Sequence, residues 1–205
     1  MSMVPSLSPH NREKLLDALG DAQRIGMLGD RSLNQVIDHS LAFVVALPET
    51  VRTVVDLGSG GGDPGLVIAA ARPEVMTSLV DRRAKRTDLL TRLVGRMGFQ
   101  SHVEVLEIEV NKSGPTYTFE TLQELNNNYP ESEFILILGS DAVAGIDTWK
   151  EPNLVKTLAR IYVVQRARDF TQDWHFDHIQ MPPIEISSTS IREKVKNNES
   201  ISELV

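Results

Sequence analysis

After Pro48 the chain alternates short apolar runs with amphipathic segments, and this alternation restricts its fold more than any other feature. The apolar runs carry few polar residues, which is typical of parallel strands that are covered on both faces. The expected strands are 53–57, 77–80, 103–108, 134–138, 161–164 and 179–181, and the expected helices between them include 64–71, 84–97, 119–127 and 190–196. The pattern predicts an α/β fold with a doubly wound parallel sheet and helices on both faces.

Two helices are expected ahead of the first strand. Ser8 is a suitable N-cap because Pro9 follows it in the first turn. The first helix is then marked by apolar residues at helical spacing, namely Leu15, Leu16, Leu19 and Ala22, and the second by Val36, Ile37, Leu41, Val44 and Val45. No internal repeat and no interdomain linker is evident, so we expect one domain over residues 1–205.

Composition excludes several classes of function. The chain has 205 residues, 41% of them hydrophobic, and no cysteine, which excludes disulfides, thiolate metal sites and cysteine nucleophiles. The net charge of −7 argues against extended binding to a nucleic-acid backbone. No apolar run is as long as a membrane span and the polar N-terminus is unlike a signal peptide, so we expect a cytoplasmic protein with no membrane partner.

One basic run departs from this acidic balance. It comprises Arg82, Arg83, Lys85 and Arg86, with Arg92 and Arg96 further along the same predicted helix. A solvated helix face is the favoured interpretation, and a contact to RNA is the alternative.

The clearest chemistry lies in the segment from Val54 to Gly65, where an apolar strand runs into a glycine-rich turn and then into a helix. Such a turn lets backbone amides approach a nucleoside-like ligand at the carboxyl edge of a sheet. The next strand ends at Asp81, which is about as far downstream as an acidic residue that grips ribose hydroxyls. The alternative is that the glycines only make a tight strand-to-helix turn.

Three segments carry a family resemblance over roughly residues 1–106: Asp56-Leu57-Gly58-Ser59-Gly60-Gly61-Gly62-Asp63-Pro64-Gly65-Leu66, Leu79-Val80-Asp81-Arg82-Arg83 and Asp38-His39-Ser40-Leu41. They resemble the small-subunit ribosomal RNA methyltransferase G family, also called glucose-inhibited division protein B. The resemblance implies S-adenosylmethionine as cofactor and methylation of a guanine. It implies cofactor contacts at Asp56, Gly58, Ser59, Gly60 and Gly62, with Asp81 on the ribose.

Two departures from that family bear on function. Asp63 stands where the family usually has an apolar residue, and its carboxylate is expected either to repel the methionine carboxylate of the cofactor or to face water. The family's fourth strand, its serine-arginine-alanine segment and its later lysine-glycine element are absent. RNA binding and methyl transfer are therefore not expected.

Residues 107–205 carry a second resemblance. It rests on Ser113-Gly114-Pro115-Thr116-Tyr117-Thr118, Leu138-Gly139-Ser140-Asp141, Trp149-Lys150 and Ile186-Ser187-Ser188-Thr189-Ser190-Ile191-Arg192. These motifs resemble bacterial nicotinate-nucleotide adenylyltransferase. The resemblance implies that Tyr117, Thr118 and Trp149 hold the nicotinate ring and that Gly139 and Asp141 contact ribose. It also implies that Ser187, Ser188, Thr189 and Arg192 bind ATP phosphates. The alternative is that this turn only caps a helix.

The histidines argue against adenylyl transfer. That family uses a histidine-x-glycine-histidine element to stabilise charge on the transferring phosphate, and none of the chain's five histidines forms one. His175 and His178 lie near each other in a polar segment without further ligands, so no metal site is expected there.

Both families build Rossmann-like sheets, and the join near 106–109 lies at the end of the third expected strand. We therefore interpret the chain as an engineered chimera of two halves, 1–106 and 107–205. We expect it to bind S-adenosylmethionine, in preference to ATP, without catalysing either parental reaction. A working methyltransferase, a working adenylyltransferase and a purely structural protein are the alternatives.

Overall fold

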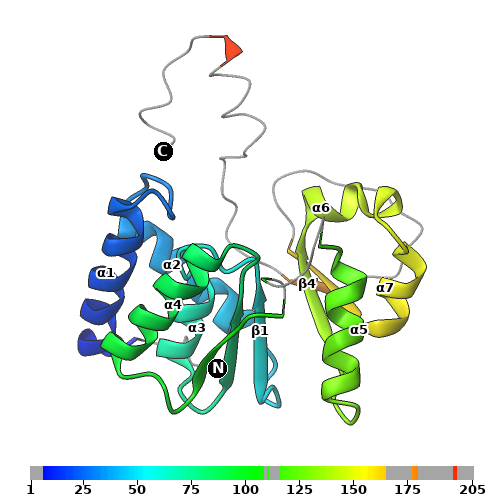
Figure 1. Ribbon diagram of the computed structural model, residues 1–205, viewed down its shortest axis with the longest axis horizontal. Helices are drawn as coiled ribbons and strands as arrows, with labels where there is room; N and C mark the ends of the chain where they lie inside the picture. Colours follow the sequence, from blue (N-terminus) through cyan, green and yellow to red (C-terminus); the bar gives the residue numbers. More distant parts are fainter. Residues whose placement is uncertain (1–6, 109, 111–115, 165–176, 180–195, 198–205) are drawn as a thin grey trace. The chain divides into compact units, whose positions relative to one another are not determined.

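The computed structural model describes residues 7–108, 110, 116–164, 177–179 and 196–197. These residues fall into two compact units, the first within 1–112 and 192–205 and the second within 113–191. The predicted fold class is confirmed, because helices alternate with strands and every pairing between described strands is parallel (Figure 1). One domain over residues 1–205 stays a prediction.

The first unit contains a parallel sheet in the order β1-β2-β3. Its strands are β1 (Thr53–Leu57), β2 (Met76–Val80) and β3 (Val103–Leu106). The register pairs Thr53 with Met76 and Leu57 with Val80, so β1 and β2 end at the same edge. The glycine turn that follows β1 and the turn that follows β2 therefore meet at this edge.

Four helices accompany this sheet: α1 (Pro9–Arg24), α2 (Leu33–Ala46), α3 (Gly65–Ala71) and α4 (Ala84–Met97). Helix α1 packs against the other three (Figure 1). Ser8 caps α1 as predicted, since its hydroxyl oxygen accepts a hydrogen bond from the Asn11 amide at 3.1 Å. The core between helices and sheet is apolar, and its fully buried members include Leu15, Leu19, Ile37, Leu66, Leu79 and Leu90.

The second unit contains a parallel sheet in the order β4-β5-β6, made of β4 (Ile135–Gly139), β5 (Arg160–Val164) and β6 (Asp177–Ile179). Its helices are α5 (Thr118–Asn128), α6 (Ser140–Ala144), the 3₁₀ turn η1 (Ile146–Thr148) and α7 (Pro152–Leu158). Helix α5 packs against α7, and α6 follows β4 without an intervening loop. The end of β4 is thus the start of a helix.

The predicted elements agree closely with these bounds. β1 and α4 match to the residue, and most others shift by one or two residues, while β3 ends at Leu106 rather than at residue 108. Residues 190–195 of the last predicted helix lie outside the described residues. Val45 was expected on the apolar face of α2 but is 54% exposed, because adjacent residues lie about 100° apart around a helix and Val44 takes the buried position. Within the described part, no helix has the length and apolar character needed to cross a membrane.

We predict that Leu19→Ala lowers the free energy of unfolding by about 2–5 kcal/mol, because Leu19 is fully buried where α1 meets the core. Val45→Ala is the matched control on an exposed apolar side chain and should change it by less than about 0.5 kcal/mol. Urea unfolding followed by circular dichroism measures both. Equal effects of the two substitutions would contradict this assignment of the core.

Candidate functional site

The glycine turn folds back onto the end of β2. Gly58, Gly60 and Gly62 all have positive φ, at 81°, 53° and 104°, a backbone region that other residues rarely adopt. The amides of Gly58 and Ser59 donate to the carbonyl oxygen of Val80 at 2.8 and 2.9 Å. The turn is thereby held against the neighbouring strand.

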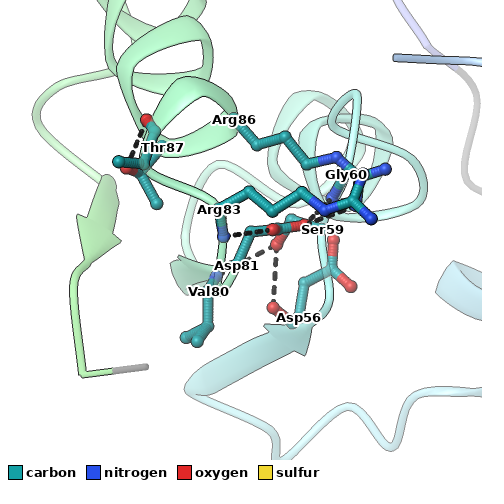
Figure 2. A network of polar contacts seen from close by, with 9 residues as sticks. Asp56, Ser59, Gly60, Val80, Asp81, Arg83, Arg86 and Thr87 are labelled. Carbon is teal, nitrogen blue, oxygen red and sulfur yellow. Dashed lines mark hydrogen bonds and ion pairs between the residues drawn. The ribbon is translucent and has the colours of Figure 1, made fainter. Parts of the chain in front are cut away.

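Ser59 ties the ends of β1 and β2 together. Its side chain is buried, and its hydroxyl donates to the Asp56 carbonyl at 2.8 Å and accepts from the Val80 amide at 3.0 Å (Figure 2). Both the hydroxyl and the backbone amide of Ser59 are thus used to hold the turn. Ser59 lies where the sequence predicts a cofactor contact, with these polar groups already bonded within the protein.

Asp81 lies at the centre of the site. Its carboxylate accepts from the Gly60 amide at 3.0 Å, from the Arg83 amide at 2.9 Å and from the Arg86 guanidinium at 3.1 Å (Figure 2). Asp81 is only 3% exposed. The structure therefore brings together Asp81 and Gly60, two residues that the resemblance assigns to the cofactor, and adds Arg86, which the sequence does not single out.

Asp56 lies beneath the turn and points at the start of α3. Its carboxylate accepts from the Gly65 amide at 3.1 Å. The pKa of Asp56 is raised from an ordinary 3.8 to about 6, mainly by burial and to a smaller extent by the carboxylates of Asp63 and Asp81, against the lowering effect of hydrogen bonds from Gly65 and Ser59. Asp56, Asp63 and Asp81 therefore form a cluster of interacting acidic groups.

Asp63 was expected to repel the cofactor carboxylate or to face water. The structure shows that Asp63 is half-buried and accepts a hydrogen bond from the hydroxyl of Ser40, a fully buried residue of α2, which the sequence did not indicate. Burial raises the pKa of Asp63, and the Ser40 hydrogen bond and the charge of Arg31 partly offset this. Asp63 thus joins the glycine turn to α2.

At two positions of the turn there is no room for any side chain, so only glycine fits. A Cβ at Gly62 would lie 2.4 Å from Cδ1 of Leu66, and a Cβ at Gly65 would lie 2.4 Å from Cδ2 of Leu79 and 2.6 Å from Oδ2 of Asp56. Gly62 and Gly65 therefore let α3 approach the sheet closely.

In the second unit, some of the residues predicted to hold a nicotinate ring lie close together. Tyr117 precedes the first residue of α5, Thr118, and its ring stacks with that of Phe119 at 6.2 Å between centroids. Nζ of Lys150 lies 4.5 Å from the centroid of the Tyr117 ring, which places the residue after Trp149 beside Tyr117. Trp149 itself is half-buried at the end of η1.

Of the remaining predicted residues, two lie in described elements and the others lie outside the described residues. Gly139 ends β4 and caps α6, and Asp141 lies in α6. Ser187, Ser188, Thr189, Arg192 and His175 lie outside the described residues. Among the residues that are described, no group of three or more His, Asp or Glu side chains could hold a metal ion.

Comparison with known proteins finds both the methyltransferase and the adenylyltransferase resemblance. Residues 14–124 match the model of a family described as rRNA small subunit methyltransferase G. A probable nicotinate-nucleotide adenylyltransferase of Exiguobacterium sibiricum is 30% identical over 141 residues, which is 67% of this chain and 73% of that protein. The chain belongs to both families. The two matches together exceed the chain's length, so they overlap instead of meeting at one residue.

Other adenylyltransferase relatives are matched over a smaller share of their length. Probable nicotinate-nucleotide adenylyltransferases of Clostridium novyi and Staphylococcus haemolyticus are 33% and 30% identical over 50% and 58% of this chain. The chain spans 58% and 62% of those two proteins. A solved structure of the nicotinic acid mononucleotide adenylyltransferase of Plasmodium falciparum has a TM-score of 0.50 at 17% identity, covering 74% of this chain and 87% of that chain. That likeness shows the Rossmann-like fold alone.

For this member of both families we predict a pH-dependent effect of Asp56→Asn on stability. The folded-state pKa of Asp56 is raised, so its stabilising contribution is complete below about pH 3.8 and is lost as the pH rises through about 6. The asparagine cannot ionise, so the variant should gain stability relative to the native chain as the pH rises from 4 to 7, by at most about 3 kcal/mol. Chemical unfolding across this pH range measures the difference, and a difference that does not vary with pH contradicts the prediction.

We also predict that Gly62→Ala lowers the free energy of unfolding by about 1–3 kcal/mol, because it combines a strained φ with a clash against Leu66. Gly29→Ala is the matched control, since its Cβ would meet no atom within 4 Å and no positive φ is involved. Thermal unfolding of the two variants should separate them by several degrees. A Gly62→Ala protein as stable as Gly29→Ala would show that the turn tolerates a side chain.

Proposed function

We propose that the chain binds S-adenosylmethionine through the glycine turn after β1 and Asp81 after β2. The observation that carries this proposal is the buried carboxylate of Asp81, which is fixed against the Gly60 and Arg83 amides at the carboxyl edge of a parallel sheet. Ligands of open α/β sheets bind at this edge. The match of residues 14–124 to a methyltransferase family supports the same cofactor.

The charges at this edge favour S-adenosylmethionine over ATP. The carboxylates of Asp63 and Asp81 both act electrostatically on Asp56, so three acidic groups gather around this edge. S-adenosylmethionine carries a sulfonium and an ammonium cation that such a cluster attracts, whereas it repels the phosphates of ATP. The ribose hydroxyls, which both ligands share, are the natural donors to a carboxylate such as Asp81.

The residues present fit the roles that the cofactor requires. The positive-φ glycines bring the backbone close without side chains in the way, and Asp81 is held in one position by two amides. When bound, S-adenosylmethionine supplies an electrophilic methyl group. The protein's part in our proposal ends at binding and orienting the cofactor.

We further propose that neither parental reaction is catalysed and that the chain is an engineered recombination of two Rossmann-like halves. The lack of a histidine-x-glycine-histidine element supports the absence of adenylyl transfer, and the lack of the serine-arginine-alanine and lysine-glycine elements supports the absence of methyl transfer. The two family matches, one of them centred on the first half of the chain, support the recombination.

Adenylyl transfer to nicotinate mononucleotide is the second candidate function. The contact between Lys150 and Tyr117, beside Trp149, favours it because an aromatic ring and an ammonium group suit an aromatic carboxylate. Pyrophosphate release from ATP with nicotinate mononucleotide is the direct assay. Our proposal expects none above a blank, and steady release would replace it by this second function.

We predict that Asp81→Asn weakens binding of S-adenosylmethionine at least about tenfold, because the ribose hydroxyls lose a charged acceptor. Asp88→Asn is the matched control, since Asp88 is an exposed carboxylate on α4. Calorimetric titration measures the affinities, and circular dichroism confirms that each variant is folded. Unchanged affinity in a folded Asp81→Asn protein contradicts the proposed site.

A further inference from the structure

Arg86 differs from the other basic residues of the run 82–86. The side chains of Arg82, Arg83 and Lys85 are exposed, whereas that of Arg86 is 29% exposed and turns back onto Asp81. Its Nη1 lies 3.1 Å from Oδ2 of Asp81 (Figure 2). Asp81 is the acidic partner of Arg86 in the described part of the chain.

The acceptor positions on Asp81 are nearly all in use. A carboxylate offers about four lone-pair positions, and Asp81 already accepts from two amides and one guanidinium. A ribose presents two neighbouring hydroxyl donors, so a carboxylate that accepts from both needs two positions. The site as it stands has room for only one.

Among the three donors, Arg86 is the one that can leave. The amides of Gly60 and Arg83 belong to the backbones of the two turns, so neither can move away without its turn. Arg86 is attached through a flexible side chain that already reaches water, so its guanidinium can be rehydrated when it moves away.

We propose that Arg86 competes with the ribose hydroxyls of the cofactor for Asp81 and so sets the affinity of the site. This inference rests on the proposed function. In the free protein Arg86 forms an ion pair with the buried carboxylate of Asp81. Binding of a ribose requires that the ion pair opens, which lowers the affinity for every ligand that carries both hydroxyls.

The test compares Arg86→Met, which removes the guanidinium but keeps an apolar stem, with Arg92→Met, an exposed arginine on the same helix. Calorimetric titration with S-adenosylmethionine should show about tenfold tighter binding for Arg86→Met and less than about twofold change for Arg92→Met. Arg86→Lys keeps a cation and should stay close to the native affinity.

A second pair of ligands separates competition from a general effect on the fold. Adenosine carries both ribose hydroxyls and should gain affinity in Arg86→Met, whereas 2′,3′-dideoxyadenosine carries neither and should gain none. An equal gain for both ligands overturns the inference. So does equal or weaker binding of S-adenosylmethionine by Arg86→Met, while leaving the proposed function in place. Absence of binding by the native chain and by Arg86→Met overturns both proposals.

Discussion

The carboxylate of Asp81 accepts hydrogen bonds from the Gly60 and Arg83 amides, and so joins the turn after β1 to the turn after β2. The parallel register makes this contact possible, because Leu57 and Val80 pair at the ends of the two strands. Ser59 strengthens the same junction from below through the Asp56 carbonyl and the Val80 amide. The shape of the candidate site therefore depends on one buried acidic side chain and one buried hydroxyl.

Burying acidic groups so close together lowers the stability of the fold, and Asp56 is the group most affected. The raised pKa of Asp56 reflects burial and the neighbouring carboxylates, while Arg86 and Ser40 supply partners to Asp81 and Asp63. A cationic ligand would relieve the remaining repulsion, and this is the basis of our proposal that the edge binds S-adenosylmethionine rather than a nucleoside triphosphate. Ionisable groups with strongly shifted pKa values cluster at functional sites.

Sequence reasoning predicted the strands and most helices because their apolar periodicity is strong, as in β1 and α4. The expected helices did not include α6 and α7, which are short and have no start signal as clear as the glycine turn and Pro64 ahead of the equally short α3. Long-range partners were not predictable from the sequence. Nothing in a basic run marks Arg86 as the residue that turns inward, and the contacts of Ser40 with Asp63 and of Lys150 with Tyr117 join segments far apart in the chain.

The chain belongs to two families, and the amides around Asp81 report most directly on binding of S-adenosylmethionine by the first unit. In a ¹⁵N-labelled native protein, addition of S-adenosylmethionine should shift the Gly60 and Arg83 amide resonances saturably, because both amides share the carboxylate that the ribose would engage. Amides of the exposed residues at the far end of α4 should stay in place. If Gly60 and Arg83 do not respond while the resonances of the second unit shift with ATP or nicotinate mononucleotide, the glycine turn and Asp81 are not the ligand site of this protein.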